Sequence, residues 1–508
     1  MLPTDRPPTH PGEMLVKEFV EVCLRRRARA DTLRPLPEQR AFMHRMWWTC
    51  VALTLLASAV VAQSPAPSAI ASREATMVIA GVSIVDTVRG TTSAPQDIVI
   101  ADGRIAEVAP ASAASARSGV TRLDGTGRFA IAGLIDVHAH LGEGGIGPQD
   151  DTTRARALRQ FLRYGVTTIF VPGATGAGDA VFSDLRRRCR LRAAECPALY
   201  GSGSILTALG SHPVSTIFAM PDDVSPEVVE ARGVTVLEPG RDIDALVAAK
   251  AAAGVDAIKI IVEDGPPPWY PKPRLGDEQI ARVIAAAHAR SLPVFAHVST
   301  ARLTRVVVEA GIDGIMHAPV DPLPQDVITR MAQRRTWYVP TFSLYDGILT
   351  WARKQRESDP YALAGVEPSV IESLTAPSFL AAAGETETSA LEYLRHGSEN
   401  LRRVAAAGVP IALGTDVNNP FVFPGYSAHE ELAWMVRAGL SPAQALQAGT
   451  VGGAAFLRAS DRIGTIARGL DADLVLLSRN PLDQIENSRS IVAVISDGRL
   501  IEHVVTAR

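Results

Sequence analysis

The chain has 508 residues, of which 47% are hydrophobic and 21% charged, with 40 Gly and 35 Pro. This composition excludes a disordered, collagen-like or coiled-coil protein, because the apolar fraction is that of a globular protein and Gly and Pro follow no period. The 51 basic and 54 acidic residues give a net charge of −3 without a basic stripe. Nucleic acid is therefore not an expected partner, and a large folded body remains.

A short apolar run near the N-terminus indicates export. Residues 47–62 read WWTCVALTLLASAVVA, and they lie between the basic residues Arg40 and Arg45 and the polar, Pro-rich QSPAPSA. A basic start, an apolar middle and small residues before a cleavage point are typical of a secretory signal peptide, here residues 43–62. A membrane anchor is the alternative, but a spanning helix needs ~20 apolar residues. We expect a secreted, periplasmic protein without a stable membrane anchor.

An additional segment precedes this signal, although a signal normally begins the chain. Residues 1–42 are rich in Arg and Pro. Our hypothesis is that translation starts at Met43 or Met46, which would leave residues 1–42 as an extension outside the working protein. Residues 63–76 would then be a linker, and the fold would begin near residue 77.

Two cysteines, Cys189 and Cys196, remain after removal of the signal and stand seven residues apart. An even number of cysteines in an oxidising compartment predicts a disulfide between them. The alternative is a pair of unbonded thiols near the end of a helix.

Both ends of the mature chain have the pattern of paired strands. Runs such as MVIAGVSIVD and DIVIADGRIAEVAP occupy residues 77–130, with Asp-Gly turns between them. Residues 461–508 repeat this style around Asp497-Gly498. Alternation broken by Asp-Gly is a hairpin signal, so we expect the two ends to form one small β-sandwich domain.

The central residues, 131–460, alternate short apolar runs with helical segments rich in Ala, Arg and Leu. The eight candidate strands are GLIDVHAH, GVTTIFVPG, ALYGSGSIL, VDAIKIIV, PVFAHV, DGIMH, TWYVPTF and VPIALGTD. Eight such units predict an α/β fold, a (β/α)8 barrel of the TIM type. A doubly wound open sheet has a similar texture and is the alternative.

Metal-binding side chains stand at the ends of these strands. His138 and His140 close the first, and the pleat places residues two apart on the same face. His297, His317 and Asp416 each end a later strand. Because barrel enzymes build their sites at this rim, the set favours a barrel with a metal centre over a satisfied surface pair of histidines.

Lys259 lies inside the apolar run VDAIKIIV. A charged residue there must be paired, modified or very costly. A neutral amine can react with carbon dioxide to form a carbamate whose two oxygens can bridge two metals. The alternative is a salt bridge to a neighbouring carboxylate.

These residues make the sequence resemble the amidohydrolase superfamily. Within it, the resemblance is to the branch related to imidazolonepropionase, which includes metal-dependent Xaa-Pro and Xaa-Arg/Lys dipeptidases. The resemblance covers about residues 77–508 and rests on AGLIDVHAHL, DAIKI, FAHV followed by MHAP, LGTD, HEELAWMVRAGLSPAQALQAGT and GTIARGLDADLVLLSRNPLD. It implies two divalent ions, with zinc expected. The implied ligands are His138, His140 and Asp416 for one metal, His297 and His317 for the other, and a carbamylated Lys259 as the bridge.

Such a centre would hydrolyse an amide bond, most simply in a dipeptide or an N-acyl amino acid. Two cations sharing a water lower its pKa to about 7, so that a bridging hydroxide can attack a polarised carbonyl. Asp416 would be the catalytic residue, accepting the proton and passing it to the leaving nitrogen. Alternatives are a lactonase, a carbamate hydrolase, and a cyclic-amide hydrolase or deaminase. A non-catalytic binding scaffold is disfavoured, because none of the six site positions is missing.

Four further residues are candidates for substrate binding. His212, in a Gly-rich loop, resembles the family's loop histidine, and a surface histidine is the alternative. Tyr270 lies in the proline-stiffened segment EDGPPPWYPKPRL, where it could wall a pocket or pack the loop down. Tyr345 could hydrogen-bond a substrate carboxylate or carbonyl, and a lid is expected around it. His429, near a helix start, is either a contact or a buried packing residue. A homo-oligomer is usual among related enzymes, but no interface can be identified.

Overall fold

A computed structural model describes residues 77–111, 119–141, 150–173, 179–191, 195–215, 220–221, 224–264, 271–353 and 359–502. The predicted extension, signal peptide and linker (1–42, 43–62 and 63–76) lie outside the described residues. Within the described part, no helix is both long and apolar enough to cross a bilayer.

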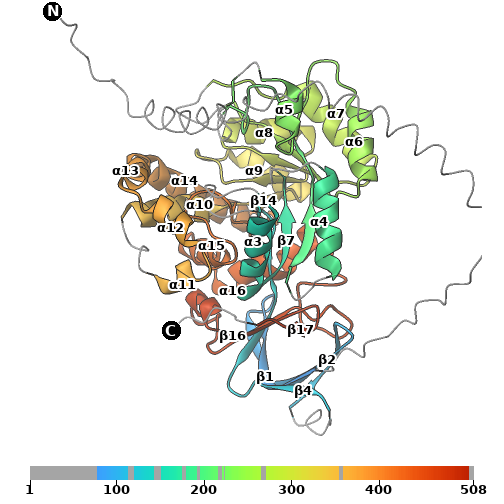
Figure 1. Cartoon of the computed structure of the whole chain (residues 1–508), viewed down its shortest axis with the longest axis vertical. Coiled ribbons are helices and arrows are strands. Elements are labelled where there is room, and N and C mark those ends of the chain that lie inside the picture. Colours follow the sequence, from blue (N-terminus) through green and yellow to red (C-terminus); the bar gives the residue numbers. More distant parts are fainter. Residues whose placement is uncertain are drawn as a thin grey trace, which may run out of the picture. The chain divides into compact units, whose positions relative to one another are not determined.

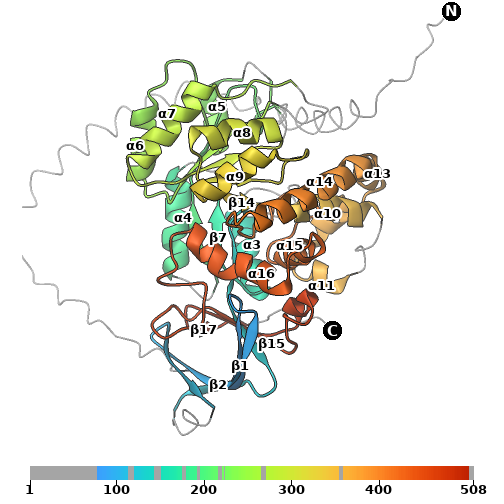
Figure 2. The same ribbon diagram turned by 180° about the vertical axis from the view of Figure 1, so that it is seen from behind.

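One mixed sheet unites the two ends of the described chain (Figures 1 and 2). Its hydrogen-bonded order is β17-β16-β15-β5-β1-β2-β3, with β4 beside β1. Residues 77–132 and 474–500 supply its strands, whereas a sandwich of two sheets is not defined by these pairings and stays a prediction. The strands are β1 (Met77–Asp86), β2 (Thr91–Ala101), β3 (Arg104–Pro110), β4 (Thr121–Asp124), β5 (Phe129–Ala132), β15 (Leu474–Leu477), β16 (Ile491–Ser496) and β17 (Arg499–Leu500).

Two Asp-Gly turns close hairpins in this sheet, at the positions that the sequence indicates. Asp102 and Gly103 have φ of 51° and 74°, and Asp497 and Gly498 have φ of 50° and 73°. A pair of left-handed residues suits the twist of a two-residue hairpin. The two turns also contact each other, since a Cβ on Gly498 would lie 2.7 Å from Cα of Gly103. A side chain at Gly498 is excluded by this contact as well as by its backbone conformation.

The central region carries parallel strands in two sheets, ordered β10-β9-β11-β12-β13-β14 and β6-β7-β8. Seven of the eight expected strands are present, but the run ALYGSGSIL is divided between β8 and β9, and β10 was not expected. The strands are β6 (Leu134–Asp136), β7 (Val166–Val171), β8 (Ala198–Gly201), β9 (Ile205–Thr207), β10 (Val234–Val236), β11 (Ile258–Ile261), β12 (Val294–His297), β13 (Gly314–Met316) and β14 (Trp337–Val339).

The eighth expected strand, residues 409–416, forms no regular strand but joins the edges of both sheets. Ile411 pairs with Tyr338 beside β14, and the Val137 N–H donates to Leu413 O at 2.8 Å beside β6. Only single bridges form along this segment. A continuous ring of eight strands is not defined among the described residues, and the closed barrel stays a prediction.

Helices alternate with these parallel strands and cover them (Figure 1). Several begin at caps that the sequence supplies: Asp150 accepts from the Thr153 N–H, and Thr300 from the Leu303 N–H. The helices are α3 (Asp151–Arg163), α4 (Asp179–Leu191), α5 (Pro226–Glu230), α6 (Ile243–Ala252), α7 (Asp277–His288), α8 (Ala301–Ala310), α9 (Gln325–Arg334), α10 (Phe342–Ala352), α11 (Pro360–Leu363), α12 (Pro368–Leu374), α13 (Pro377–Glu385), α14 (Glu387–Ala406), α15 (Tyr426–Arg437), α16 (Pro442–Gln447), the π-helix η1 (Ala448–Gly452), α17 (Gly453–Phe456) and the 3₁₀-helix η2 (Ile485–Arg489).

A buried glutamate fixes the start of α10. Glu431 of α15 accepts the Phe342 N–H at 3.0 Å and the Ser343 N–H at 2.7 Å, and its side chain is fully buried. These two N–H groups are among those that a helix cannot satisfy internally. The contact therefore ties α10 to α15 directly after β14.

Replacing Glu431 with alanine should leave both N–H groups without a hydrogen-bond acceptor and lower the free energy of unfolding by about 2–4 kcal/mol. Thermal unfolding measures this loss. Glu431→Gln keeps an acceptor in place and should lose less, and the exposed Glu392→Ala should unfold like the parent chain. Equal stability of all three variants would contradict the proposed anchoring.

Candidate metal centre

The centre begins where β6 ends. The Asp136 carboxylate accepts the His138 N–H at 3.0 Å and the Thr415 N–H at 3.1 Å, and it also accepts the Thr415 hydroxyl at 2.6 Å. Asp136 is fully buried, and burial raises the pKa of its carboxyl to about 7. It joins the segment that carries His138 and His140 to the segment that carries Asp416.

Asp416 lies at the middle of the cluster. Its Oδ1 is 3.3 Å from Nε2 of His138 and 3.3 Å from Nε2 of His140, and its Oδ2 is 3.9 Å from Nδ1 of His317. Ligand atoms of His138, His140 and Asp416 all lie within 4.8 Å of one another, a spacing that could hold a metal ion. Although burial alone would raise the pKa of Asp416, His138 and His140 lower it below its usual range. The carboxylate is therefore ionised.

The remaining histidines continue from this group as a row of rings. Ring centroids are 4.8 Å apart for His138 and His317, 4.3 Å for His317 and His297, and 4.6 Å for His297 and His212. The rings of His212 and His297 are stacked, at 22°. All five residues expected at the strand ends are thus together, and His212 lies beside them.

The backbone at two of these residues is left-handed. His317 has φ of 80° and Asp416 has φ of 59°, a conformation that costs of order 1–3 kcal/mol for a residue with a side chain. Hydrogen bonds hold it: the His317 N–H donates to Val339 O and the Asp416 N–H to His138 O, both at 2.8 Å. Gly414 permits the close approach, because a Cβ there would lie 2.7 Å from Cβ of His138.

Lys259 of β11 extends into the same interior. It is 2% exposed, and its Nζ donates to Met316 Sδ at 2.8 Å. Within the described part of the chain, no carboxylate lies within ion-pair distance of Nζ. Burial lowers the pKa of Lys259 to about 7, even though the Asp416 carboxylate opposes this shift. The amine is therefore uncharged in a substantial fraction of molecules near neutral pH.

Further contacts orient the imidazoles. His140 Nδ1 lies 2.6 Å from Gly173 O, His317 Nδ1 lies 2.9 Å from the Thr341 hydroxyl, and His297 Nε2 lies 3.7 Å from Oε2 of Glu263. In metal sites such partners fix the ring and its tautomer. Burial, the largest cause, lowers the pKa of His138, His212 and His317, so these rings are neutral and able to act as ligands.

The comparisons with known proteins identify the family. The model of the family described as "Amidohydrolase family" matches residues 129–501. The chain belongs to the amidohydrolase family. The family predicted from the motifs is confirmed, and with it the class of enzyme, a hydrolase acting on carbon–nitrogen bonds.

Similarity to curated relatives is short or low. Imidazolonepropionase from Anaeromyxobacter sp. (strain K) is 38% identical over 108 residues, which are 20% of this chain and 24% of that protein. The chain thus matches about a quarter of this relative's length. Imidazolonepropionase from Micrococcus luteus is 26% identical over 423 residues, covering 75% of this chain and 86% of that protein.

Solved structures share the fold. The structure of a putative prolidase from Bifidobacterium longum has a TM-score of 0.66 and 26% identity, and it covers 86% of this chain and 97% of that chain. A Xaa-Pro dipeptidase with bound methionine has a TM-score of 0.66 and 22% identity, with 84% and 100% covered. These amidohydrolase structures are of the TIM-barrel type, in agreement with the mixed α/β content here.

The donor set fits the metal dependence that is general in amidohydrolases. Neutral imidazoles and an ionised carboxylate are the ligands that a divalent transition metal prefers. The Nε2 atoms of His138 and His140 are directed at the same oxygen of Asp416, as expected of ligands that surround one ion.

The substrate-binding candidates have different positions in this amidohydrolase. Tyr345 of α10 stacks on Tyr393 at 3.6 Å between ring centroids, and burial, followed by the charges of Asp416 and Glu263, raises the pKa of Tyr345 to about 12. Its hydroxyl therefore stays protonated at neutral pH. Tyr270 lies outside the described residues.

His429 is engaged elsewhere. Its Nδ1 lies 2.9 Å from the Ser488 hydroxyl and its Nε2 lies 2.9 Å from Tyr164 O. Both nitrogens bind within the protein, so the contact between His429 and substrate that the sequence suggested has no free ring atom to support it. The contacts of His429 are those of the alternative, a buried packing residue.

Cys189 and Cys196 are joined as a disulfide, with Cα atoms 5.4 Å apart. The bond ties the last turn of α4 to the segment before β8. It lies outside the histidine cluster and has no part in the chemistry of the centre.

Sequence reasoning missed Glu263. This residue follows β11, is fully buried, accepts a hydrogen bond from the Ser299 hydroxyl and faces His297. In the sequence it is one of two acids after an apolar run and reads as part of a solvated loop. Its position two residues after the end of β11, one of the strands of the expected barrel, was the available signal.

Glu263→Gln should weaken metal binding about 10–100-fold if His297 is a ligand as predicted, because the buried carboxylate beside this histidine loses its charge. A chelator competition on the zinc-loaded protein measures this. Asp264→Asn makes the same change at the next residue, whose carboxylate pairs with Arg302 instead, and should leave the affinity unchanged. If both variants bound zinc with the same affinity, Glu263 would have no role in the metal centre.

Proposed function

We propose that this chain is a secreted, binuclear metal-dependent amidohydrolase that cleaves the amide bond of a dipeptide or an N-acyl amino acid. The observation that carries the proposal is the convergence of two histidines on one ionised aspartate, with Nε2 to Oδ1 distances of 3.3 Å to each. The names of the solved neighbours, prolidase and Xaa-Pro dipeptidase, support the substrate class.

Two divalent ions, with zinc as the first choice, would be held by the predicted ligands. Bound there, they would supply an activated water and polarise the scissile carbonyl. The ligands are His138, His140 and Asp416 for one ion, His297 and His317 for the other, and Lys259 between them.

A carbamate on Lys259 is part of this proposal. The uncharged amine would form an N–C bond to carbon dioxide and release one proton, giving a carbamate anion that can bind both ions. Its support is the burial of Lys259, the closeness of the Met316 sulfur and the absence of an ion-pair partner in the described residues.

The protein's own groups then have separate tasks. Asp416 would accept the proton of the attacking water and transfer it to the leaving nitrogen, which otherwise departs as an unstable anion. Tyr345, a protonated donor, would hydrogen-bond the substrate carboxylate or carbonyl. His212, stacked on His297, would line the substrate side of the centre.

A library of dipeptides and N-acyl amino acids tests the reaction. Zinc-loaded protein should release amino acids from a defined subset, and the subset shows which side of the bond the pocket recognises. If the loaded protein leaves the whole library intact, the proposal is wrong. Cyclic amides are the second candidate, because a dihydroorotase from Pelotomaculum thermopropionicum is 25% identical over 436 residues.

Export is tested separately. Protein recovered from the periplasmic fraction should begin at Gln63 if residues 43–62 are removed as a signal peptide. A mature protein that begins at Met1 would contradict both the signal and the later translation start.

A further inference from the structure

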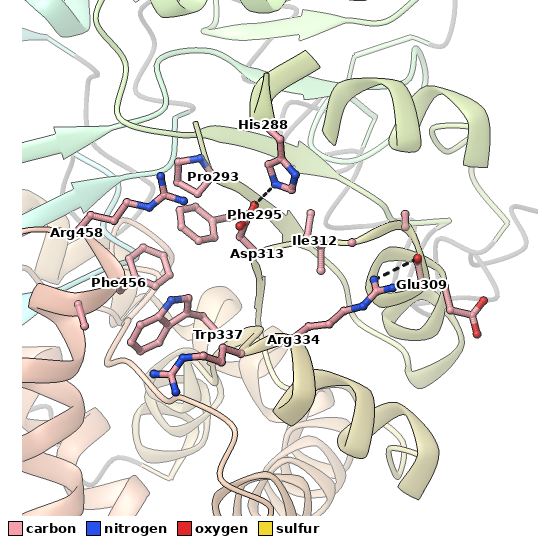
Figure 3. Close-up of a pocket in the computed structure, with 14 residues that line it drawn as sticks. His288, Pro293, Phe295, Glu309, Ile312, Asp313, Arg334, Trp337, Phe456 and Arg458 are labelled. Atoms are coloured by element: carbon pink, nitrogen blue, oxygen red, sulfur yellow. Dashed lines mark hydrogen bonds and ion pairs between the residues drawn. The ribbon is translucent and has the colours of Figure 1, made fainter. Parts of the chain in front are cut away.

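A cavity of about 480 Å³ lies at the opposite ends of three strands that carry the metal centre (Figure 3). It is lined by Pro293 and Phe295 of the β12 segment, Asp313 before β13, and Trp337 of β14. These residues stand at the N-terminal ends of their strands, whereas His297, His317 and Thr341 stand at or just past the C-terminal ends. The cavity is therefore separate from the candidate active site.

One wall of the cavity is aromatic. Phe295 and Phe456 stack at 4.2 Å between ring centroids and 15°, and Trp337 meets Phe456 edge to face at 5.7 Å. The two phenylalanines are 2% and 3% exposed, while the indole of Trp337 is partly accessible. Trp337 thus presents ring surface to the cavity from a rigid support.

Three guanidinium groups line the same cavity. Nη1 of Arg458 donates to Ser291 O at 2.8 Å, and Nη1 of Arg334 donates to Val308 O at 2.6 Å. In Figure 3 these two arginines enter from opposite sides. Such bonds fix each guanidinium while leaving other N–H groups available. Arg335 is exposed and forms no ion pair within the described residues.

Two carboxylates of the lining, Asp313 and Glu309, stand against these three positive charges. Asp313 accepts from His288 Nε2 at 2.7 Å and from the Val294 N–H at 2.8 Å. Glu309 lies 3.5 Å from Arg305, an arginine outside the cavity lining. The three arginines therefore exceed the two carboxylates of the lining by one charge.

We propose that this cavity binds a small organic anion with a planar ring, such as a nucleoside monophosphate or an aromatic carboxylate. The ring would lie against Trp337, and the phosphate or carboxylate would bind the guanidinium group of Arg335, whose forked donors match such oxyanions, while Arg458 adds positive charge to the wall. The volume is within the range of pockets for small molecules.

The cavity and the metal centre lie on two sides of the same packed strand side chains. Phe295 and His297 are two residues apart on β12 and share a face. Phe295, Met316 and Val339 belong to one buried cluster with Phe456, and Met316 accepts the hydrogen bond of Lys259. The same packed layer contacts the aromatic wall on one side and the proposed bridging lysine on the other.

Calorimetric titration of the purified, zinc-loaded chain tests this proposal. Adenosine 5′-monophosphate and indole-3-acetate serve as the two probes. Adenosine and indole are controls that lack the anionic group, and inorganic phosphate is a control that lacks the ring. At least one probe should bind saturably, and its ringless or uncharged counterparts should bind at least about tenfold more weakly. The proposal would be overturned if inorganic phosphate bound as tightly as either probe. It would also be overturned if neither probe bound saturably.

Variants distinguish this cavity from the metal centre, which can also bind anions. Arg335→Gln should weaken probe binding at least about tenfold, and Arg458→Gln should weaken it less. Arg330→Gln, an exposed arginine of α9 outside the lining, is the matched control and should bind as the parent does. Arg335→Gln breaks no hydrogen bond within the described residues, so it stays informative if Arg458→Gln proves unstable. Unchanged affinity in Arg335→Gln would place the probe elsewhere and overturn the proposal.

Discussion

Asp416→Asn is expected to lower kcat/KM by about 10³–10⁴ while the chain still folds. The amide keeps the size of the carboxylate and one oxygen ligand, but it cannot accept the proton of the attacking water or deliver it to the leaving nitrogen, and general acid–base catalysis contributes up to about 10⁴. The change also removes the charge on which His138 and His140 converge. Turnover of the best library substrate measures the effect.

Two measurements separate loss of chemistry from loss of metal. Zinc content and thermal unfolding of the Asp416→Asn protein show whether the centre and the fold persist. Asp461→Asn, an exposed aspartate far along the chain, makes the same change without touching the cluster and should keep full turnover. Normal turnover in Asp416→Asn would mean that another group moves the proton.

Lys259→Ala should reduce the bound zinc from two ions per chain to one and lower turnover by about 10²-fold or more, since one of the two charges on the carbonyl and water is lost. The truncated side chain leaves space beside Met316, into which a small carboxylate can enter. Acetate or propionate should therefore restore part of the second zinc and part of the activity. Metal analysis across an acetate titration measures both.

Lys259→Met fills the same space with an apolar chain of similar length and is the matched control. It should also lose the second zinc, but no carboxylate should restore it, because the cavity is occupied. Isotope-labelled bicarbonate should in addition label the parent protein and neither variant. A Lys259→Ala protein with two zinc ions and normal turnover would eliminate the carbamate bridge.

The ligand positions could be predicted because they depend on local pattern. His138 and His140 are two apart at the end of an apolar run, and Asp416 ends another run, so the position of each polar residue after its run was enough to predict that they lie together, although the last run forms no regular strand. The Asp-Gly turns at Asp102 and Asp497 are equally local, since two left-handed positions are needed whatever surrounds them.

The supporting residues could not be predicted, because their roles come from tertiary contacts. Asp136, Glu263 and Glu431 are buried carboxylates whose partners, Thr415, His297 and the start of α10, are remote in sequence or reach them only in the folded structure. From the sequence alone, an acidic residue that follows an apolar run is assigned to a solvated loop, because its buried partner cannot be identified.

The expected eighth strand failed for a related reason. Residues 409–416 have the composition of a strand, but this segment ends at Asp416 in a left-handed conformation, and Gly414 packs against His138. The requirements of the centre override strand propensity, so only isolated bridges form. The His429 alternatives could not be separated because a buried histidine on a helix looks the same in sequence with or without a ligand.

The sheet shared by both ends of the chain imposes an order on biosynthesis. Ala132 of β5 pairs with Leu474 of β15, so the edge of β5 has no partner until nearly the whole polypeptide has been made. An open strand edge is a site of self-association, and pairing between such remote segments is slow. During synthesis, β5 therefore stays without its β15 partner until the C-terminal part of the chain has been made. A protein truncated before β15 would keep the edge of β5 unpaired permanently.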